Sequence, residues 1–146
     1  MVKHYYELPI RFSSLLKRNS DLNTCDLKKS IAQNLYLIIT SKFEEHRYDK
    51  SYGCELWDMD FELIANQNLW LERIRKSVAN SVTRHEVRLY EIAVEIEIGQ
   101  DENLTSLKDS KSVKKKLSIY IKGRIRETGE EFPFSTTIYL SPLSLD

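Results

Sequence analysis

Six carboxylates lie close together in the middle of the sequence, and acid–base catalysis is the chemistry that they could support. They are Glu44, Glu45, Glu55, Asp58, Asp60 and Glu62. A glycosidase uses two carboxylates at a fixed separation across a sugar-binding cleft. Acidic residues are frequent throughout this chain, and a sequence cannot show a cleft. A hydrolase is therefore an alternative hypothesis and not the leading one.

Histidine and cysteine, the usual side chains of metal centres and nucleophilic sites, are few and scattered. The candidates are His4, His46, His85, Cys25 and Cys54. No two of them have the CxxC or HxxxH spacing of a zinc site, and the sequence has neither a G-x-S-x-G motif nor a glycine-rich phosphate loop. We therefore predict no metal and no cofactor, and we interpret both cysteines as buried or half-buried free thiols.

A short charged hinge, Arg84-His85-Glu86-Val87-Arg88, offers another kind of chemistry, the recognition of a partner protein. It brings a carboxylate, an imidazole and two guanidinium groups into five residues. The simpler interpretation is a solvated turn whose cations cap the end of a helix. The other interpretation is a preorganised Glu86–Arg88 pair that docks a partner. Spacing alone favours the simpler one.

The hinge lies where the periodicity of the sequence changes from that of a helix to that of a strand. Apolar residues before it recur at steps of three and four, which predicts a helix over about residues 69–84, capped by Asn66 or Asn68. This stripe consists of Leu71, Ile74, Val78 and Val82. After the hinge, apolar residues alternate with mainly acidic ones, which predicts a strand. Its apolar face carries Tyr90, Ile92, Val94, Ile96 and Ile98.

Three segments precede this helix–strand unit. Residues 1–22 are interpreted as an arm, either irregular or with a short edge strand. Asn23 or Thr24 is expected to cap an amphipathic helix over about residues 25–41, and Tyr36, Leu37 and Ile39 are expected to widen its apolar face. Residues 42–63 are predicted to form an ordered loop that ends in a short helical turn. Gly53 is expected in a turn that needs the backbone freedom of glycine.

Two more strands follow a polar stretch, residues 99–115, that is predicted to be a long loop. The first has an apolar face of Leu117, Ile119, Ile121 and Ile125, and the second alternates Phe132, Phe134, Ile138 and Leu140 with polar residues. On the outer face we expect two rows of opposite charge to lie side by side. The acidic row is Glu91, Glu95 and Glu97, and the basic row is Lys122, Arg124 and Arg126.

These elements predict an α+β fold in which two amphipathic helices pack on a three-stranded antiparallel meander. At 146 residues, one domain over 1–146 is expected, with an arm (1–22), a helical part (23–84) and a sheet (85–146). Twenty-two basic residues balance 22 acidic ones, so no net charge favours nucleic acid or an anionic membrane. Because the sequence has no signal peptide and no apolar run of bilayer length, we expect a cytoplasmic protein without membrane insertion.

Several short motifs occur in an order that is typical of one family. They are Ser30-Ile31 with Asn34-Leu35, then Thr40-Ser41-Lys42-Phe43-Glu44-Glu45-His46-Arg47-Tyr48, then Tyr52-Gly53-Cys54-Glu55-Leu56 with Phe61, and finally Glu86 and Arg88. Together they resemble the phage baseplate-wedge family often labelled "lysozyme-like", whose type VI secretion member is TssE. Glu86 and Arg88 match the ends of its E-P-R motif. The resemblance covers about half of the chain, residues 27–98.

The sequence departs from the family pattern at four positions. Phe43 replaces a proline, Glu44 and Glu55 replace glycines, and Val87 replaces the proline of E-P-R. Valine restores an amide hydrogen and frees φ, so a less rigid hinge is expected than in other members.

The resemblance implies a non-enzymatic structural component of the baseplate of a contractile injection machine, most similar to TssE. The partners that it implies are wedge proteins similar to TssF and TssG, sheath proteins similar to TssB and TssC, and other baseplate subunits. Glu86 and Arg88 would meet the wedge, while Glu45, His46, Arg47 and Gly53 would form the neighbouring part of the partner-binding surface. An edge of the sheet would accept a strand of the sheath. The alternatives are a phage-tail baseplate component and a peptidoglycan hydrolase.

Overall fold

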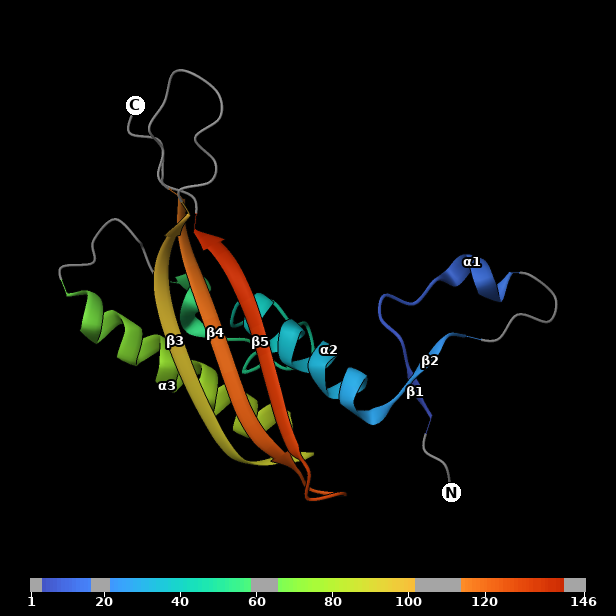
Figure 1. Cartoon of the computed structure of the whole chain (residues 1–146). Coiled ribbons are helices and arrows are strands. Elements are labelled where there is room, and N and C mark those ends of the chain that lie inside the picture. The colour runs from blue at the N-terminus through green and yellow to red at the C-terminus, as the bar shows by residue number, and fades with distance from the viewer. Residues whose placement is uncertain (1–3, 17–21, 59–65, 102–113, 141–146) are drawn as a thin grey trace.

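Two helices cover one face of a three-stranded antiparallel sheet in the computed structural model of the chain (Figure 1). The structure describes residues 4–16, 22–58, 66–101 and 114–140. This arrangement confirms the predicted α+β fold. The predicted loop over residues 99–115 is described only at its two ends. The hydrolase candidates Asp60 and Glu62, in the predicted loop over residues 42–63, lie outside the described residues. None of the helices in these ranges is long and apolar enough to cross a membrane.

Both long helices begin at a side chain that caps their first turn. α3 (Gln67–His85) begins after Asn66, whose side chain accepts a hydrogen bond from the Leu69 amide at 3.1 Å, as predicted. α2 (Leu27–Thr40) is capped by Asp26, whose carboxylate accepts from the Lys29 amide at 2.8 Å. The predicted caps, Asn23 and Thr24, are therefore wrong. Thr24 instead belongs to a short strand, which delays the start of the helix.

The sheet has the order β3-β4-β5, and each strand runs antiparallel to its neighbour. Its strands are β3 (Leu89–Asp101), β4 (Lys114–Ile125) and β5 (Glu131–Leu140). β3 and β4 therefore extend into both ends of the predicted 99–115 loop, because Gly99 pairs with Lys116 and Asp101 with Lys114. The two strands are therefore longer than predicted. Residues 102–113 lie outside the described part.

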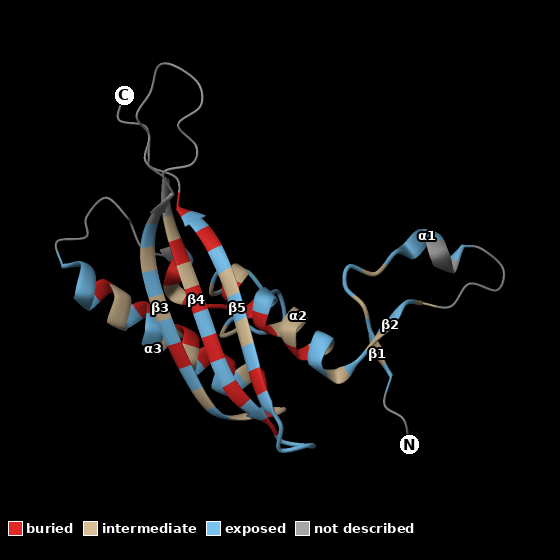
Figure 2. Ribbon diagram, viewed as in Figure 1, coloured by how far each residue is buried: buried red, intermediate tan, exposed pale blue. Residues whose placement is uncertain are grey.

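The core lies between the helices and the inner face of the sheet, where buried or half-buried residues alternate with more exposed ones along much of each strand (Figure 2). β4 contributes the most complete row, because every second residue from Leu117 to Ile125 is buried. α2 contributes Ile31, Leu35, Ile38 and Ile39, and α3 contributes Trp70, Ile74, Val78 and Val82. The predicted widening of the α2 face holds for Ile39 only, since Tyr36 and Leu37 are 53% and 41% exposed.

The outer face of the sheet does not carry the two matched rows of charge that the sequence predicts. Glu91 does pair with Arg124 at 3.3 Å. Glu95 and Glu97, however, lie opposite Tyr120 and Ser118. A bulge between Tyr90 and Ala93 shifts the register of β3, and Glu91 within it has a positive φ of 52°. A register shift of this kind cannot be read from alternation alone.

The remaining elements are short. In the arm, β1 (Tyr5–Tyr6) pairs with β2 (Thr24–Cys25), and α1 (Phe12–Leu15) lies between them in sequence. The arm extends away from the sheet beyond the start of α2 (Figure 1). The loop after α2 ends in the 3-10 helix η1 (Glu55–Asp58), which agrees with the predicted helical turn. Both cysteines are free thiols; Cys54 is buried and Cys25 half-buried.

Candidate functional site

The hinge between α3 and β3 is organised around a buried carboxylate. Glu86 is 1% exposed, and its amide donates to the Val82 carbonyl at 2.8 Å to close the last turn of α3. The simpler sequence interpretation, a solvated turn, is therefore wrong for Glu86. An ionised carboxylate at such a position needs both a counter-charge and hydrogen bonds, because desolvation strongly disfavours a bare buried charge.

Arg88 supplies the counter-charge in a two-pronged arrangement. Its Nη2 and Nε donate to Glu86 Oε2 and Oε1 at 2.6 and 2.7 Å, and its amide donates to Oε1 at 3.1 Å. Paired hydrogen bonds of this kind fix orientation as well as charge. The hydrogen bonds to Glu86 raise the pKa of the Arg88 guanidinium above its already high usual value. The pair is thus preorganised within the monomer, as the second interpretation of the hinge required.

α2 completes the shell around this pair with two side chains spaced one helical turn apart. Asn34 Nδ2 donates to Glu86 Oε2 at 3.0 Å and to the His85 carbonyl at 3.2 Å. Ser30 Oγ accepts from Arg88 Nη1 at 2.9 Å. Neither residue was among the predicted site residues. Two signals could have found them: both belong to the motifs Ser30-Ile31 and Asn34-Leu35, and their spacing of four places the hydroxyl and the amide on one face of the helix.

The loop after α2 reaches the same network through Tyr52. The Tyr52 hydroxyl donates to Asn34 Oδ1 at 2.9 Å, and burial raises the pKa of this phenol. Its ring lies between two imidazoles, with centroids 5.2 Å from His85 and 5.4 Å from His46. His85 Nε2 also lies 3.0 Å from the carbonyl oxygen of Ser51. Three segments that are distant in sequence therefore hold one carboxylate in place.

The predicted loop residues have individual roles that the structure makes explicit. Glu45 accepts from the Lys42 amide at 2.9 Å, and His46 Nδ1 accepts from the Asp49 amide at 3.1 Å, so both close turns of the loop. Arg47 is exposed and lies over the Tyr48 ring. Gly53 is buried with φ 116°, and a Cβ there would lie 2.6 Å from the Ser41 carbonyl oxygen. Gly53 thus lets the loop approach the end of α2 and is not itself a surface residue.

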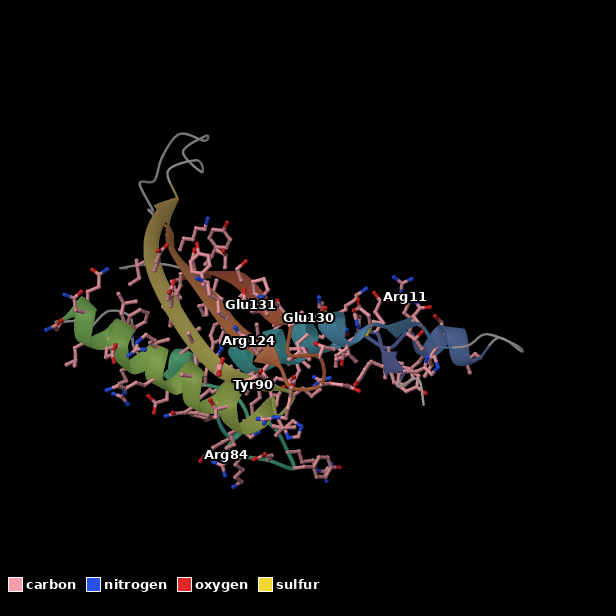
Figure 3. All side chains as sticks on the ribbon, turned by 60° about the horizontal axis from the view of Figure 1, so that its bottom comes forward. Arg11, Arg84, Tyr90, Arg124, Glu130 and Glu131 are labelled. Atoms are coloured by element: carbon pink, nitrogen blue, oxygen red, sulfur yellow. The ribbon has the colours of Figure 1, made fainter. Side chains whose placement is uncertain are left out.

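The outward side of the hinge is apolar at its centre and cationic around it. Val87 is 69% exposed, and the side chain of Arg88 is 27% exposed. Arg126 Nε donates to the Val87 carbonyl at 3.1 Å, and its guanidinium lies over the Tyr90 ring. Arg84 is exposed at the end of α3 (Figure 3). A groove beside Val87 is lined by Thr83, Val87, Leu89, Tyr90, Glu91, Ile92 and Arg126.

The acidic residues considered for hydrolysis are partly assembled. Glu44 and Glu55 line one groove between the loop and α3, together with Lys50 and Arg84. Glu55 forms an ion pair with Arg73 at 3.0 Å. Among the residues that the structure describes, no three His, Cys, Asp or Glu side chains are grouped to bind a metal ion.

Fold and site together define a small α+β domain in which a buried polar cluster braces the corner between α3 and β3. A family model described as baseplate wedge protein gp25 matches residues 25–130, and the chain belongs to that family. The resemblance predicted from the short motifs is thereby confirmed, and so is the coarser functional prediction of a phage or secretion baseplate component.

The structural comparison agrees with this assignment at the level of fold. A crystal structure at 1.44 Å of a proposed tail lysozyme from Geobacter sulfurreducens superimposes with a TM-score of 0.58 and 20% sequence identity. The match covers 85% of this chain and all of that one. No curated protein matches the sequence. At this identity the likeness establishes the fold and carries no activity to this chain.

Proposed function

We propose that this protein is a non-enzymatic, TssE-like subunit of a type VI secretion baseplate that joins the wedge to the contractile sheath. Its partners would be wedge proteins similar to TssF and TssG and a first sheath ring of TssB- and TssC-like proteins. Membership of the baseplate wedge family supports this proposal, together with the motifs around Glu45 and Glu86. The observation that carries it is the buried Glu86–Arg88 pair, which α2 and the loop both brace.

In this proposal the buried part of the hinge holds its shape, and the exposed part contacts the partner. Glu86 is too deeply buried to contact a partner directly, so its role is to hold Arg88 and the backbone of the corner. Val87 and the exposed part of Arg88 would meet the wedge, with Arg84 and Arg126 at the periphery. Glu45, His46 and Arg47 would extend the contact along the loop, in the shape that Gly53 permits.

The sheath contact would use backbone groups of the sheet. β3 and β5 are the outer strands of the three-stranded sheet, and neither has a second strand neighbour within the described residues. Such an edge presents unpaired N–H and C=O groups to which another chain can add a strand. The inner face is already covered by α2 and α3, so strand addition would extend the sheet without disturbing the core.

The proposal is tested by placing a negative charge at Val87, the exposed centre of the hinge, without changing Glu86 or Arg88. Val87→Asp would be co-expressed with wedge and sheath proteins from the same genome, and Leu69→Asp is a matched control because Leu69 is also 69% exposed. We expect Val87→Asp to reduce co-purification of wedge proteins by roughly tenfold or more, as truncation of a central interface residue does. Leu69→Asp should have little effect. Equal recovery with both variants would rule out the hinge as the wedge contact.

A phage-tail baseplate component is the second candidate, because the family description names a baseplate wedge protein and no particular machine. Gene order separates the two. Wedge and sheath genes beside a gene for an AAA+ sheath-recycling ATPase would indicate secretion, whereas adjacent capsid genes would indicate a phage. For the hydrolase alternative, we expect purified protein to leave cell-wall substrate intact; clearance that is lost in Glu45→Gln would refute the non-enzymatic proposal.

A further inference from the structure

Two neighbouring rows of side chains on α2 hold two different segments of the chain. Ser30 and Asn34 hold the hinge. Lys29 and Gln33 each come one residue earlier and hold the arm. Lys29 forms an ion pair with Glu7, and Gln33 Oε1 accepts a hydrogen bond at 2.5 Å from the backbone amide of the next arm residue. Because consecutive residues of a helix are rotated by about 100°, the two rows lie side by side, and the arm is held next to the hinge.

Tyr5 connects the arm to the hinge directly. It is half-buried in β1, between the exposed residues His4 and Tyr6. The centroid of its ring lies 5.6 Å from the guanidinium carbon of Arg88, a distance at which a ring face attracts a cation. β1 pairs Tyr5 with Cys25, just before the start of α2. The base of the arm therefore places an aromatic ring against the cation of the buried hinge pair.

The contact with Tyr5 differs in kind from the other contacts of Arg88. Glu86 and Ser30 accept hydrogen bonds from its N–H groups, which lie in the plane of the guanidinium. The Tyr5 ring attracts the cation through its π face instead. Together these contacts leave the Arg88 side chain 27% exposed. Tyr5 thus helps to determine which part of the guanidinium remains available to a partner.

The arm is an addition to the domain that the family shares, because the family model matches residues 25–130. Its strands β1 and β2 lie beyond the N-terminal end of α2 (Figure 1). They have two paired residues each, and an isolated two-stranded pairing is at best marginally stable in water. The contacts with α2 and with Arg88 therefore hold the arm in place more than its own strands do.

We propose that Tyr5 is a positioning residue of the hinge. The arm presses the Tyr5 ring against Arg88 and so fixes the direction in which the guanidinium meets the wedge. This inference rests on the proposed function, in which Val87 and the exposed part of Arg88 contact the wedge. An arm outside the shared domain would then tune the affinity of the shared contact without itself touching the wedge.

The experiment compares the affinities of full-length variants for wedge proteins from the same genome. Tyr5→Leu removes the ring but keeps an apolar side chain, whereas Tyr5→Phe keeps the ring. Tyr6→Leu is the matched control, because Tyr6 is the next residue of the same strand and is 56% exposed. We expect Tyr5→Leu to raise the dissociation constant, Kd, by about 2- to 30-fold, the range that one cation–π contact allows. Tyr5→Phe and Tyr6→Leu should bind as the wild type does.

A spectroscopic measurement separates positioning from a general loss of structure. The nuclear magnetic resonance signal of the Arg88 Nε–H group, in ¹⁵N-labelled protein, should shift in Tyr5→Leu because the neighbouring ring is gone. It should stay in place in Tyr5→Phe and Tyr6→Leu. Circular dichroism spectra should be the same for all of these proteins. An Arg88 signal that does not move in Tyr5→Leu would refute the contact itself.

A second background tests whether Tyr5 acts through Arg88. Glu86→Gln/Arg88→Gln removes both charges together, so neither is left buried without its partner. In this background Tyr5→Leu should cause no further loss of affinity, because no guanidinium is left to position. An equal loss in both backgrounds would show that Tyr5 itself touches the wedge, and the positioning role would be wrong.

The remaining outcomes also decide between the two proposals. Unchanged affinity of Tyr5→Leu, with binding lost in Val87→Asp, refutes the positioning role and leaves the proposed function standing. Tighter binding by Tyr5→Leu also refutes it, because the arm would then cover the contact surface. If the wild type binds no wedge protein, or Val87→Asp binds as the wild type does, the proposed function fails and the positioning role fails with it.

Discussion

Two Glu–Arg pairs in this molecule join the same chemical groups in opposite surroundings. Glu86 and Arg88 meet at 2.6 Å, with side chains that are 1% and 27% exposed. Glu91 and Arg124 meet at 3.3 Å on the outer face of the sheet, where their side chains are 68% and 45% exposed. The first pair is enclosed by Asn34 and Ser30, while Arg124 in the second also lies 3.6 Å from Glu131 (Figure 3).

The comparison shows that the surroundings of an ion pair, more than the pair itself, determine how much stability is lost when one partner is removed. In the exposed pair each charge is well solvated when its partner is removed, so little stability is at stake. In the hinge pair the carboxylate has no access to water, and loss of one partner leaves a buried charge without compensation. The hinge pair therefore couples the end of α3, the start of β3 and α2, whereas the exposed pair links only neighbouring strands.

Arg88→Ala should produce the largest loss of stability. It leaves Glu86 buried with only the amide of Asn34 and backbone groups as partners, and the removal of one member of a buried pair lowers the free energy of unfolding by about 3–5 kcal/mol. Urea unfolding followed by circular dichroism measures this change. Arg124→Ala is the matched control, and its loss should be below about 1 kcal/mol. Similar losses for the two variants would show that the hinge carboxylate is not desolvated in solution.

Much of the frame around the hinge could be predicted from sequence, because its signals are local. The apolar stripe of α3, the cap at Asn66 and the alternation along β4 each involve residues a few positions apart. The cap of α2 was missed because several capping residues stand in a row before it, and the choice of Asp26 depends on the pairing of Tyr5 with Cys25. A contact between segments 20 residues apart leaves no periodicity to detect.

The candidate site itself was predicted only in part for the same reason. Glu86 and Arg88 were identified through the family motif, but the burial of Glu86 depends on Asn34, which lies 52 residues earlier. Nothing in the five hinge residues distinguishes a solvated turn from an enclosed one. Likewise, Glu91 alone pairs with Arg124 because the antiparallel register places Glu95 and Glu97 opposite Tyr120 and Ser118, and that register depends on contacts between strands distant in sequence.

Tyr52→Phe should cause an intermediate loss of stability, and the size of that loss should depend on pH. The variant loses the hydrogen bond to Asn34, which lowers the free energy of unfolding by about 0.5–1.5 kcal/mol near neutral pH. Burial raises the pKa of the Tyr52 phenol in the folded state above its usual value of 10.0. The contribution is therefore complete below pH 10 and is lost as the pH rises through the folded-state pKa, since the unfolded phenol ionises first.

The measurement is the difference in unfolding free energy between wild type and Tyr52→Phe at pH 7 and at successive values above pH 10. That difference should shrink with rising pH. Tyr139→Phe serves as the control, because Tyr139 is 53% exposed on the outer face of β5 and should show no comparable trend. A difference that stays constant above pH 10 would mean that the Tyr52 ring is solvated, and the link between the loop and Asn34 would have to be abandoned.

Glu91→Gln should cause the smallest loss of stability, and high salt should abolish that loss. The glutamine keeps the size of the side chain at a backbone position with positive φ, so the variant tests the charge alone. We expect a loss of about 0–1 kcal/mol at low ionic strength. At about 1 M salt, where the screening length falls to about 3 Å, the two proteins should unfold at the same urea concentration. The defect of Arg88→Ala should persist in that salt, because ions screen only the charges that they can reach. Were both defects to vanish together, the two pairs would share one solvated environment and the contrast between them would fail.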